Sequence, residues 1–424
     1  MIWVYYIFVL INLFILLTKK QKFTFVDLYY ISSLFYYLNA FFGEIYSLHS
    51  LRFPIPLEIN NTTYILLWLN QIIILMFYVI PRRYNKNLIY EEPKMNYNLV
   101  SSYKIVVLFL FIAALFFTID MNLFTRVEFN KSELLQDSSF IETYFKYGSF
   151  YFFVSGLYLW KELNSVWKVL AIYPLIVTFL MGHRSFIVLS LIAFFIIYIN
   201  KNINKNNLIT FLKKNRKIII AALFLISFVY IIKGVSGALF VGDTELVKER
   251  LSSPSYYFDS FKMSESNIIL NHINYVVSYG LDISKSTYTG ILSLLIPFIG
   301  RFFQIESFNS FLQASFYPEY NPGTLGNSFI AEAYAQGSII LVVFLIIILL
   351  TFANVFFKLT VSPKTSLFLR TWAMTVGIEC AFYIHRNSLY TFFVRLRVYL
   401  YLTILFYLIY TCYNIFKQTL TKRR

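Results

Sequence analysis

Arginine is the residue type in this sequence that is best suited to chemistry, because its guanidinium group binds phosphate oxygens in bidentate geometry. Ionisable groups are costly inside a membrane helix and usually face a cavity or a partner. Five arginines border or enter apolar segments and are therefore candidate anion ligands: Arg184, Arg301, Arg386, Arg395 and Arg397.

Three of these arginines belong to the last apolar hairpin. On one helix Arg386 and Arg397 would differ by about 20° and share a face, whereas Arg395 and Arg397 would differ by about 200°. If the helix begins early enough, Arg386 and Arg397 form one basic stripe. Glu379 and Arg395 lie at similar depths in the two arms of the hairpin, so they could form an ion pair, which would be structural.

Glu332 is the carboxylate with the most suggestive position. It lies in the segment 321–337, NPGTLGNSFIAEAYAQG, whose Pro and glycines interrupt regular structure just before an apolar helix. The helix dipole favours a carboxylate there, which explains Glu332 by capping electrostatics. The functional alternative is a general base directed at a hydroxyl.

His183 and His385 are further candidate proton acceptors, and Lys233 is a further cation. Three of the candidate sites also have a simpler explanation. The sequence Gly-His-Arg at 182–184 fits a turn with an interfacial arginine, Lys233 fits a helix C-terminus whose dipole it complements, and Arg301 fits a headgroup anchor.

The elements that position these residues are membrane helices. The chain has 424 residues, of which 58% are hydrophobic and 14% charged, with a mean hydropathy of +0.63; a soluble domain carries nearer a quarter charged residues. The net charge of +16 then reflects membrane topology rather than nucleic acid. Two cysteines exclude a disulfide scaffold and a thiolate metal cluster, and four histidines leave little for a metal centre.

Apolar runs long enough for a hydrocarbon core of about 30 Å predict an all-α polytopic membrane protein with about eleven transmembrane helices. The spans cover residues 2–17, 24–46, 62–80, 102–119, 144–160, 165–182, 184–200, 216–233, 329–357, 366–384 and 390–412. Most of the 37 Lys and Arg fall in alternate connections, which the positive-inside rule assigns to the cytoplasm. The N-terminus is then outside and the C-terminus inside.

We expect one polytopic domain, 1–424, with a single large outward connection at residues 234–328. Apolar and aromatic residues recur in this connection at helical spacing, which predicts two or more short helices over the outer mouth of the bundle. Cys380 and Cys412 fall at opposite ends of neighbouring spans, so they do not pair.

Two local sequences carry a family resemblance: LLIPFIGR at Leu294–Arg301 and LGNSFIAEAYAQG at Leu325–Gly337. Together with the many helices, the large loop in the second half and the outward arginines, they resemble the O-antigen and capsule repeat-unit polymerases of the Wzy type, the oligosaccharide repeat unit polymerases. The odd number of spans departs from the even number that is common in that family.

The resemblance implies an integral-membrane glycosyltransferase of the bacterial inner membrane with a periplasmic active site. It would move a glycan from undecaprenyl diphosphate onto the non-reducing end of another lipid-linked repeat unit, with no metal or other cofactor. The implied partners are the lipid-linked donor and acceptor, the bilayer and a chain-length regulator protein, with no nucleic acid.

The same resemblance assigns roles to the candidate residues. Glu332 is the preferred base and His385 the second choice, while Arg395 either joins the diphosphate site or pairs with Glu379. The implied ligands of the donor diphosphate are Arg184, Arg301, Arg386 and Arg397.

Two other functions stay open. An O-antigen ligase shares the lipid donor and a similar topology but transfers the finished glycan to lipid A core. A lipid-linked oligosaccharide flippase is a transporter and would need cations at several depths along a central cavity. Here the outward cations concentrate near one surface, and no long internal repeat is visible.

Overall fold

The computed structural model describes residues 1–19, 22–47, 55–80, 96–121, 140–202, 208–216, 220, 243–253, 257, 264–281, 308, 311–312 and 326–422. This part of the chain is almost entirely helical, which confirms the all-α class. Its one described sheet is a short antiparallel pair, β1 (Glu44–Tyr46) with β2 (Pro56–Glu58).

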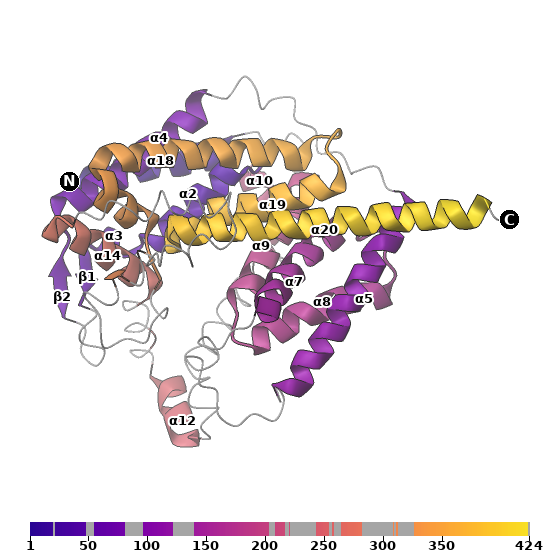
Figure 1. Cartoon of the computed structure of the whole chain (residues 1–424). Coiled ribbons are helices and arrows are strands. Elements are labelled where there is room, and N and C mark those ends of the chain that lie inside the picture. The colour runs from indigo at the N-terminus through magenta and orange to yellow at the C-terminus, as the bar shows by residue number, and fades with distance from the viewer. Residues whose placement is uncertain are drawn as a thin grey trace.

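The helices assemble into a layered bundle (Figure 1). In the first half of the chain they are α1 (Ile2–Thr18), α2 (Phe25–Tyr36), α3 (Asn39–Phe42), α4 (Asn61–Val79), α5 (Tyr97–Asp120), α7 (Phe140–Tyr158), α8 (Ser165–Leu180), α9 (Ser185–Asn202) and α10 (Leu208–Lys214). In the second half they are α12 (Thr244–Ser252), α14 (Glu265–Tyr279), α18 (Phe329–Val361), α19 (Leu367–Ala381), the short 3-10 helix η2 (Tyr383–Arg386) and α20 (Leu389–Lys422).

Four of these helices, α4, α5, α18 and α20, are long and apolar enough to cross a membrane, and α1, α8 and α9 are shorter apolar helices. Large apolar side chains cover their outer faces, among them Phe109, Phe116 and Phe344. An apolar surface of this kind suits lipid rather than water. The chain therefore has the composition and construction of a helical membrane protein.

Nine of the eleven predicted spans coincide with a helix, and the predicted span 216–233 lies outside the described residues apart from residues 216 and 220. The predicted single span 24–46 is wrong. This stretch divides into α2, α3 and β1, and the 12 residues of α2 rise only about 18 Å. Gly43, with φ of 75°, ends α3 in the left-handed conformation and turns the chain into the strand.

Helix α18 contains a break inside the predicted span 329–357. The glycines of the segment 321–337 predicted an interruption before the apolar helix, not within it. Gly337 and Ser338 have non-helical backbone angles, and Ser338 has a φ of 53°. The break separates a short first segment, which carries Glu332, from a long apolar segment that packs beside α4 (Figure 1).

Helix α19 lies at the centre and packs against α18, α20, α7 and α2. Gly377 makes the contact with α2 possible, because a Cβ there would lie 2.2 Å from Cε2 of Phe25. At the other end of α19 the buried Arg370 donates hydrogen bonds to the carbonyls of Ser362 and Thr365, just beyond the C-terminus of α18. One charged side chain thus closes the turn between the two helices.

Two described helices, α12 and α14, belong to the connection at residues 234–328, as expected. Helix α14 packs against α18, α2, α4 and η2, so it covers the end of the bundle where α19 meets α20.

Candidate functional site

The start of α20 is fixed by a carboxylate from another helix. Ser388 caps the helix by accepting a hydrogen bond from the Thr391 amide at 3.1 Å. Oε2 of Glu332 accepts a second one from the Leu389 amide at 2.7 Å. A buried carboxylate is stabilised at a helix N-terminus by the unpaired N–H groups and the dipole. Glu332 therefore fastens the first segment of α18 to α20.

Of the two roles left open for Arg395, the structure shows the ion pair with Glu379. Nη1 of Arg395 lies 2.8 Å from Oε2 of Glu379, and the Tyr399 hydroxyl donates to Oε1 at 3.0 Å. The side chains are only 13% and 1% exposed for Arg395 and Glu379. Two charges removed from water need such close geometry and additional hydrogen bonds to offset desolvation. The pair joins the two arms of the last hairpin.

Tyr383 of η2 contacts two guanidinium groups. The Arg395 Cζ lies 4.4 Å from the ring centroid and the Arg386 Cζ lies 5.6 Å from it, within the range of cation–π attraction. Two arginines predicted as anion ligands are thus brought together around one ring.

Arg386 also pairs with a carboxylate of the large connection. Its Nη1 lies 2.7 Å from Oε1 of Glu265, the first residue of α14. The two side chains are 29% and 28% exposed, so this pair is far more accessible than the one between Glu379 and Arg395. The Arg386 side chain packs on Gly326, where a Cβ would lie 3.1 Å from its Cγ.

His385, the second candidate base, lies in an aromatic enclosure. Its Nδ1 is 3.0 Å from the Tyr37 hydroxyl, and its ring centroid lies 4.4 Å from that of Tyr29 and 5.7 Å from that of Phe329. Complete burial lowers the pKa of His385 to about 3. The imidazole is neutral at physiological pH and packs as part of the core.

A second polar cluster lies on α7 and the turn that follows α8. Nε2 of His183 is 3.0 Å from Oε1 of Glu142, and the ammonium group of Lys146 is 3.8 Å from the same oxygen. Lys146 and Arg395 repel each other electrostatically, so this cluster adjoins the hairpin site. Arg184, next to His183, is half-buried and forms no ion pair with a described residue.

The predicted basic stripe along one helix is not formed. Asn387 and Ser388 are not helical and separate η2 from α20, which begins at Leu389. Arg386 therefore belongs to η2 rather than to α20. Arg397 lies on α20 and interacts electrostatically with Tyr144 of α7. The candidates Arg301 and Lys233 lie outside the described residues.

Four polar residues of this region were not predicted from the sequence: Glu142, Lys146, Glu265 and Tyr383. The pair of Glu142 and Lys146 could have been predicted from the sequence, because opposite charges four residues apart pair on a helix. Tyr383 carries none, since it is one of 35 tyrosines in the chain. Glu265 meets Arg386 only through the packing of α14 on η2.

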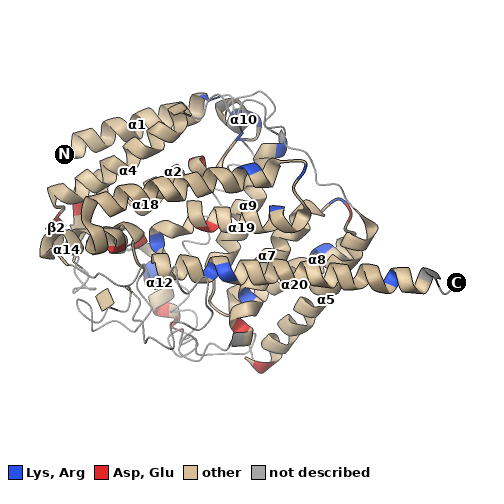
Figure 2. Ribbon diagram, turned by 45° about the horizontal axis from the view of Figure 1, so that its top comes forward, with Lys and Arg blue, Asp and Glu red and all other residues tan. Residues whose placement is uncertain are grey.

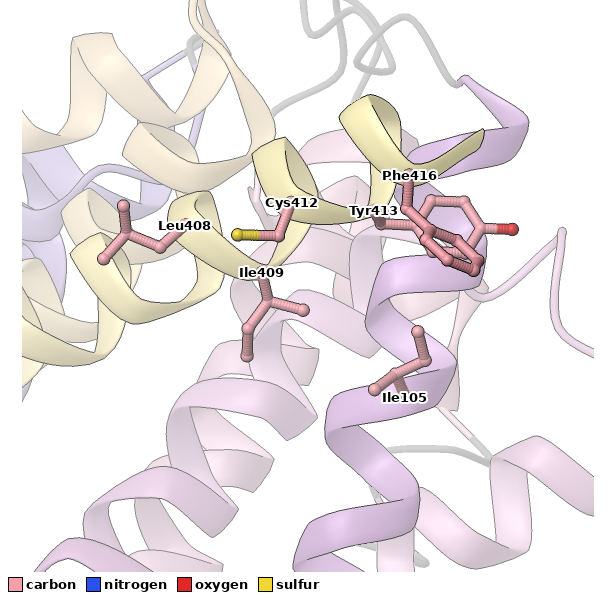
Figure 3. A pocket seen from close by; sticks show the side chains of 6 residues that line it. All are labelled: Ile105, Leu408, Ile409, Cys412, Tyr413 and Phe416. Carbon is pink, nitrogen blue, oxygen red and sulfur yellow. The ribbon is translucent and has the colours of Figure 1, made fainter. Parts of the chain in front are cut away.

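A different kind of surface lies at the far end of α20. An apolar groove of about 370 Å³ runs between α20 and α5, with Cys412 on its wall (Figure 3). Its other lining residues are Ile105, Leu408, Ile409, Tyr413 and Phe416. Both cysteines are free, as expected.

Within the described residues, no group of three or more His, Cys, Asp or Glu side chains could hold a metal ion. No known protein-family model, curated protein or solved structure matches the chain.

Proposed function

We propose that this protein is an integral-membrane glycosyltransferase of the oligosaccharide repeat unit polymerase type, with a polyprenyl-diphosphate-linked oligosaccharide as donor. The observation that carries the proposal is the convergence of Arg386 and Arg395 on Tyr383, at one end of a bundle of membrane-length helices. The sequence resemblance supports the same reaction.

The chemistry of the transfer explains why such a site suits this donor. A diphosphate leaving group develops negative charge as the sugar departs, and positioned cations stabilise that charge most when they are already in place. Arg386 is the contact we assign to the diphosphate, because its partner Glu265 is accessible and can be exchanged for phosphate. Arg395 stays paired with Glu379. Its positive charge acts on the diphosphate at a distance, from the Tyr383 ring that both arginines contact.

The remaining candidates have supporting places in this proposal. Glu332 and His385 are buried, so we assign them to positioning: Glu332 fixes the start of α20 and His385 packs η2 against α2. Arg184 and Arg397 are half-buried and stay candidates for the rest of the diphosphate site. The cation-rich alternate connections support an orientation with this end of the bundle in the periplasm.

Incubation of the purified full chain with one synthetic lipid-linked repeat unit tests the proposal. A ladder of elongated products is expected from the wild type. Arg386→Ala should lower elongation by about 100-fold or more, because it removes a stabilising donor at the leaving group. Arg386→Lys should recover only part of the rate, since an ammonium cannot bind phosphate in bidentate fashion.

Lys248→Ala is the matched control, because Lys248 is an exposed cation on α12 of the same connection. It should elongate like the wild type. No ladder from the wild type would contradict the polymerase proposal. A single transfer to lipid A core would indicate the ligase, and movement of the glycolipid across vesicles without any transfer would indicate the flippase.

A further inference from the structure

The transfer also needs a group that accepts the proton of the attacking hydroxyl, and this inference rests on the proposed function. Three carboxylates near the site are enclosed. Glu332 is buried against the Leu389 amide, Glu379 is 1% exposed, and Glu142 is 7% exposed beside Lys146 and His183. A base must reach the hydroxyl that it deprotonates.

Glu265 differs from these three carboxylates in both exposure and partner. It is 28% exposed, and its Oε1 lies 2.7 Å from the Arg386 guanidinium, the group to which we assign the diphosphate. A carboxylate and a phosphate compete for the same face of an arginine. Donor binding would therefore displace Glu265 from Arg386 while leaving it beside the reacting sugar.

We infer that Glu265 is the proton acceptor of the transfer and that it is masked by Arg386 until the donor diphosphate takes its place. The acceptor hydroxyl oxygen then attacks the anomeric carbon, and the bond from that carbon to the phosphate oxygen breaks. Its electron pair leaves with the diphosphate, and the hydroxyl proton passes to the Glu265 carboxylate. The negative diphosphate nearby favours that proton transfer, because a like charge favours the neutral acid.

The masking has a second consequence that can be measured without turnover. Glu265 competes with the donor for Arg386, so removal of its charge should not weaken diphosphate binding and should strengthen it. A true proton acceptor is thus distinguished from a residue that binds the donor, because the loss of the donor-binding residue Arg386 weakens binding as well as chemistry.

The test compares Glu265→Gln and Glu265→Asp in the purified full chain, with Glu249→Gln as the matched control on α12, where Glu249 is exposed. Elongation of the synthetic lipid-linked repeat unit and binding of undecaprenyl diphosphate alone are measured for each. Glu265→Gln should elongate about 100-fold more slowly or worse, the range for loss of a general base, while it binds undecaprenyl diphosphate at least as tightly as the wild type. Glu265→Asp should retain an intermediate rate and Glu249→Gln the full rate.

Tyr383→Phe is measured in parallel, because the Tyr383 ring also contacts the Arg386 guanidinium. If Glu265→Gln elongates within a few-fold of a wild type that forms a ladder, or if Tyr383→Phe alone stops elongation, Glu265 is not the base and the proposed function stands. Weaker binding of undecaprenyl diphosphate to Glu265→Gln overturns the masking. A wild type that forms no ladder removes the proposed function and this inference with it.

Discussion

The cations at the two ends of α20 have different surroundings. Near its N-terminus, the Arg395 side chain is largely buried. It contacts the Glu379 carboxylate of the central helix α19 and the ring of Tyr383. Near its C-terminus, Lys417 contacts the neutral amide of Asn98 and the ring of Tyr97, beside an apolar groove (Figure 3). Between Arg397 and Lys417 α20 carries no charged residue, and its charges gather in the same two places in Figure 2.

The difference indicates which end can do chemistry. A guanidinium that already binds a carboxylate can exchange it for a phosphate, and the partly exposed pair of Arg386 and Glu265 offers such an exchange. A lysine over an aromatic ring at the end of a helix is the common pattern of an interfacial anchor. The following predictions test this contrast, from the largest effect to the smallest.

Glu379→Ala should produce the largest loss of stability. It leaves Arg395 buried without its carboxylate, and breaking a buried pair in this way costs about 3–5 kcal/mol. The fall in the free energy of unfolding can be measured by denaturant titration in mild detergent. The double substitution of Glu379 and Arg395 by Leu should recover much of the loss, because two apolar side chains leave no uncompensated charge. If the double variant is as unstable as Glu379→Ala, the loss does not come from an orphaned charge.

Glu332→Ala should cost about 1–3 kcal/mol, because it leaves the buried Leu389 amide without its acceptor. Glu332→Gln should cost less, since its amide oxygen can still accept that hydrogen bond. Comparison of the two variants separates the contribution of the hydrogen bond to the Leu389 amide from that of the negative charge of Glu332. Equal thermal stability of Glu332→Ala and the wild type would contradict the positioning role.

Acid should destabilise the hairpin end through His385. Its pKa is about 3 in the folded protein, because burial disfavours the charged form, and about 6.5 in an unfolded chain. Between these values the unfolded state binds more protons, so stability is full above pH 6.5 and falls as the pH drops. The slope is up to about 1.4 kcal/mol per pH unit.

Thermal unfolding between pH 7.5 and 5.5 measures this slope, and His385→Gln should reduce it. His272 of α14 contributes in the same direction, because burial lowers its pKa to about 4. The slope should therefore disappear only partly in His385→Gln. An unchanged slope in that variant would mean that His385 is accessible to protons in the folded protein.

Much of the helical architecture could be predicted from the sequence, because length and hydropathy are local properties. The pattern failed at 24–46, where apolar and aromatic residues form a broken segment instead of one span. Its buried Asp27 and Ser32 could have signalled a helix packed inside the protein, but a composition rich in Phe and Tyr obscured that signal.

The candidate site was predictable where two residues lie at equal depth in adjoining helices, and less so where a helix boundary or long-range packing decides the contact. The pair of Glu379 and Arg395 follows from their equal depth in the hairpin. The contacts of Arg386 depend on where α20 begins and on how α14 packs, and neither is encoded in local spacing. Tertiary packing thus gave Arg386 a carboxylate partner that the stripe along one helix did not include.

Lys417→Met should have the smallest effect and sharpens the contrast between the two ends of α20. Methionine keeps an apolar stem but loses the charge that contacts Asn98 at 2.9 Å and the Tyr97 ring at 4.7 Å. Such a half-buried contact to a neutral amide and an aromatic ring contributes about 1 kcal/mol, so the melting temperature should fall by a few degrees at most and elongation should stay at the wild-type rate. If Lys417→Met instead slows elongation as strongly as Arg386→Ala does, the C-terminal end of α20 takes part in substrate binding, and the division of the helix into a chemical end and an anchoring end is wrong.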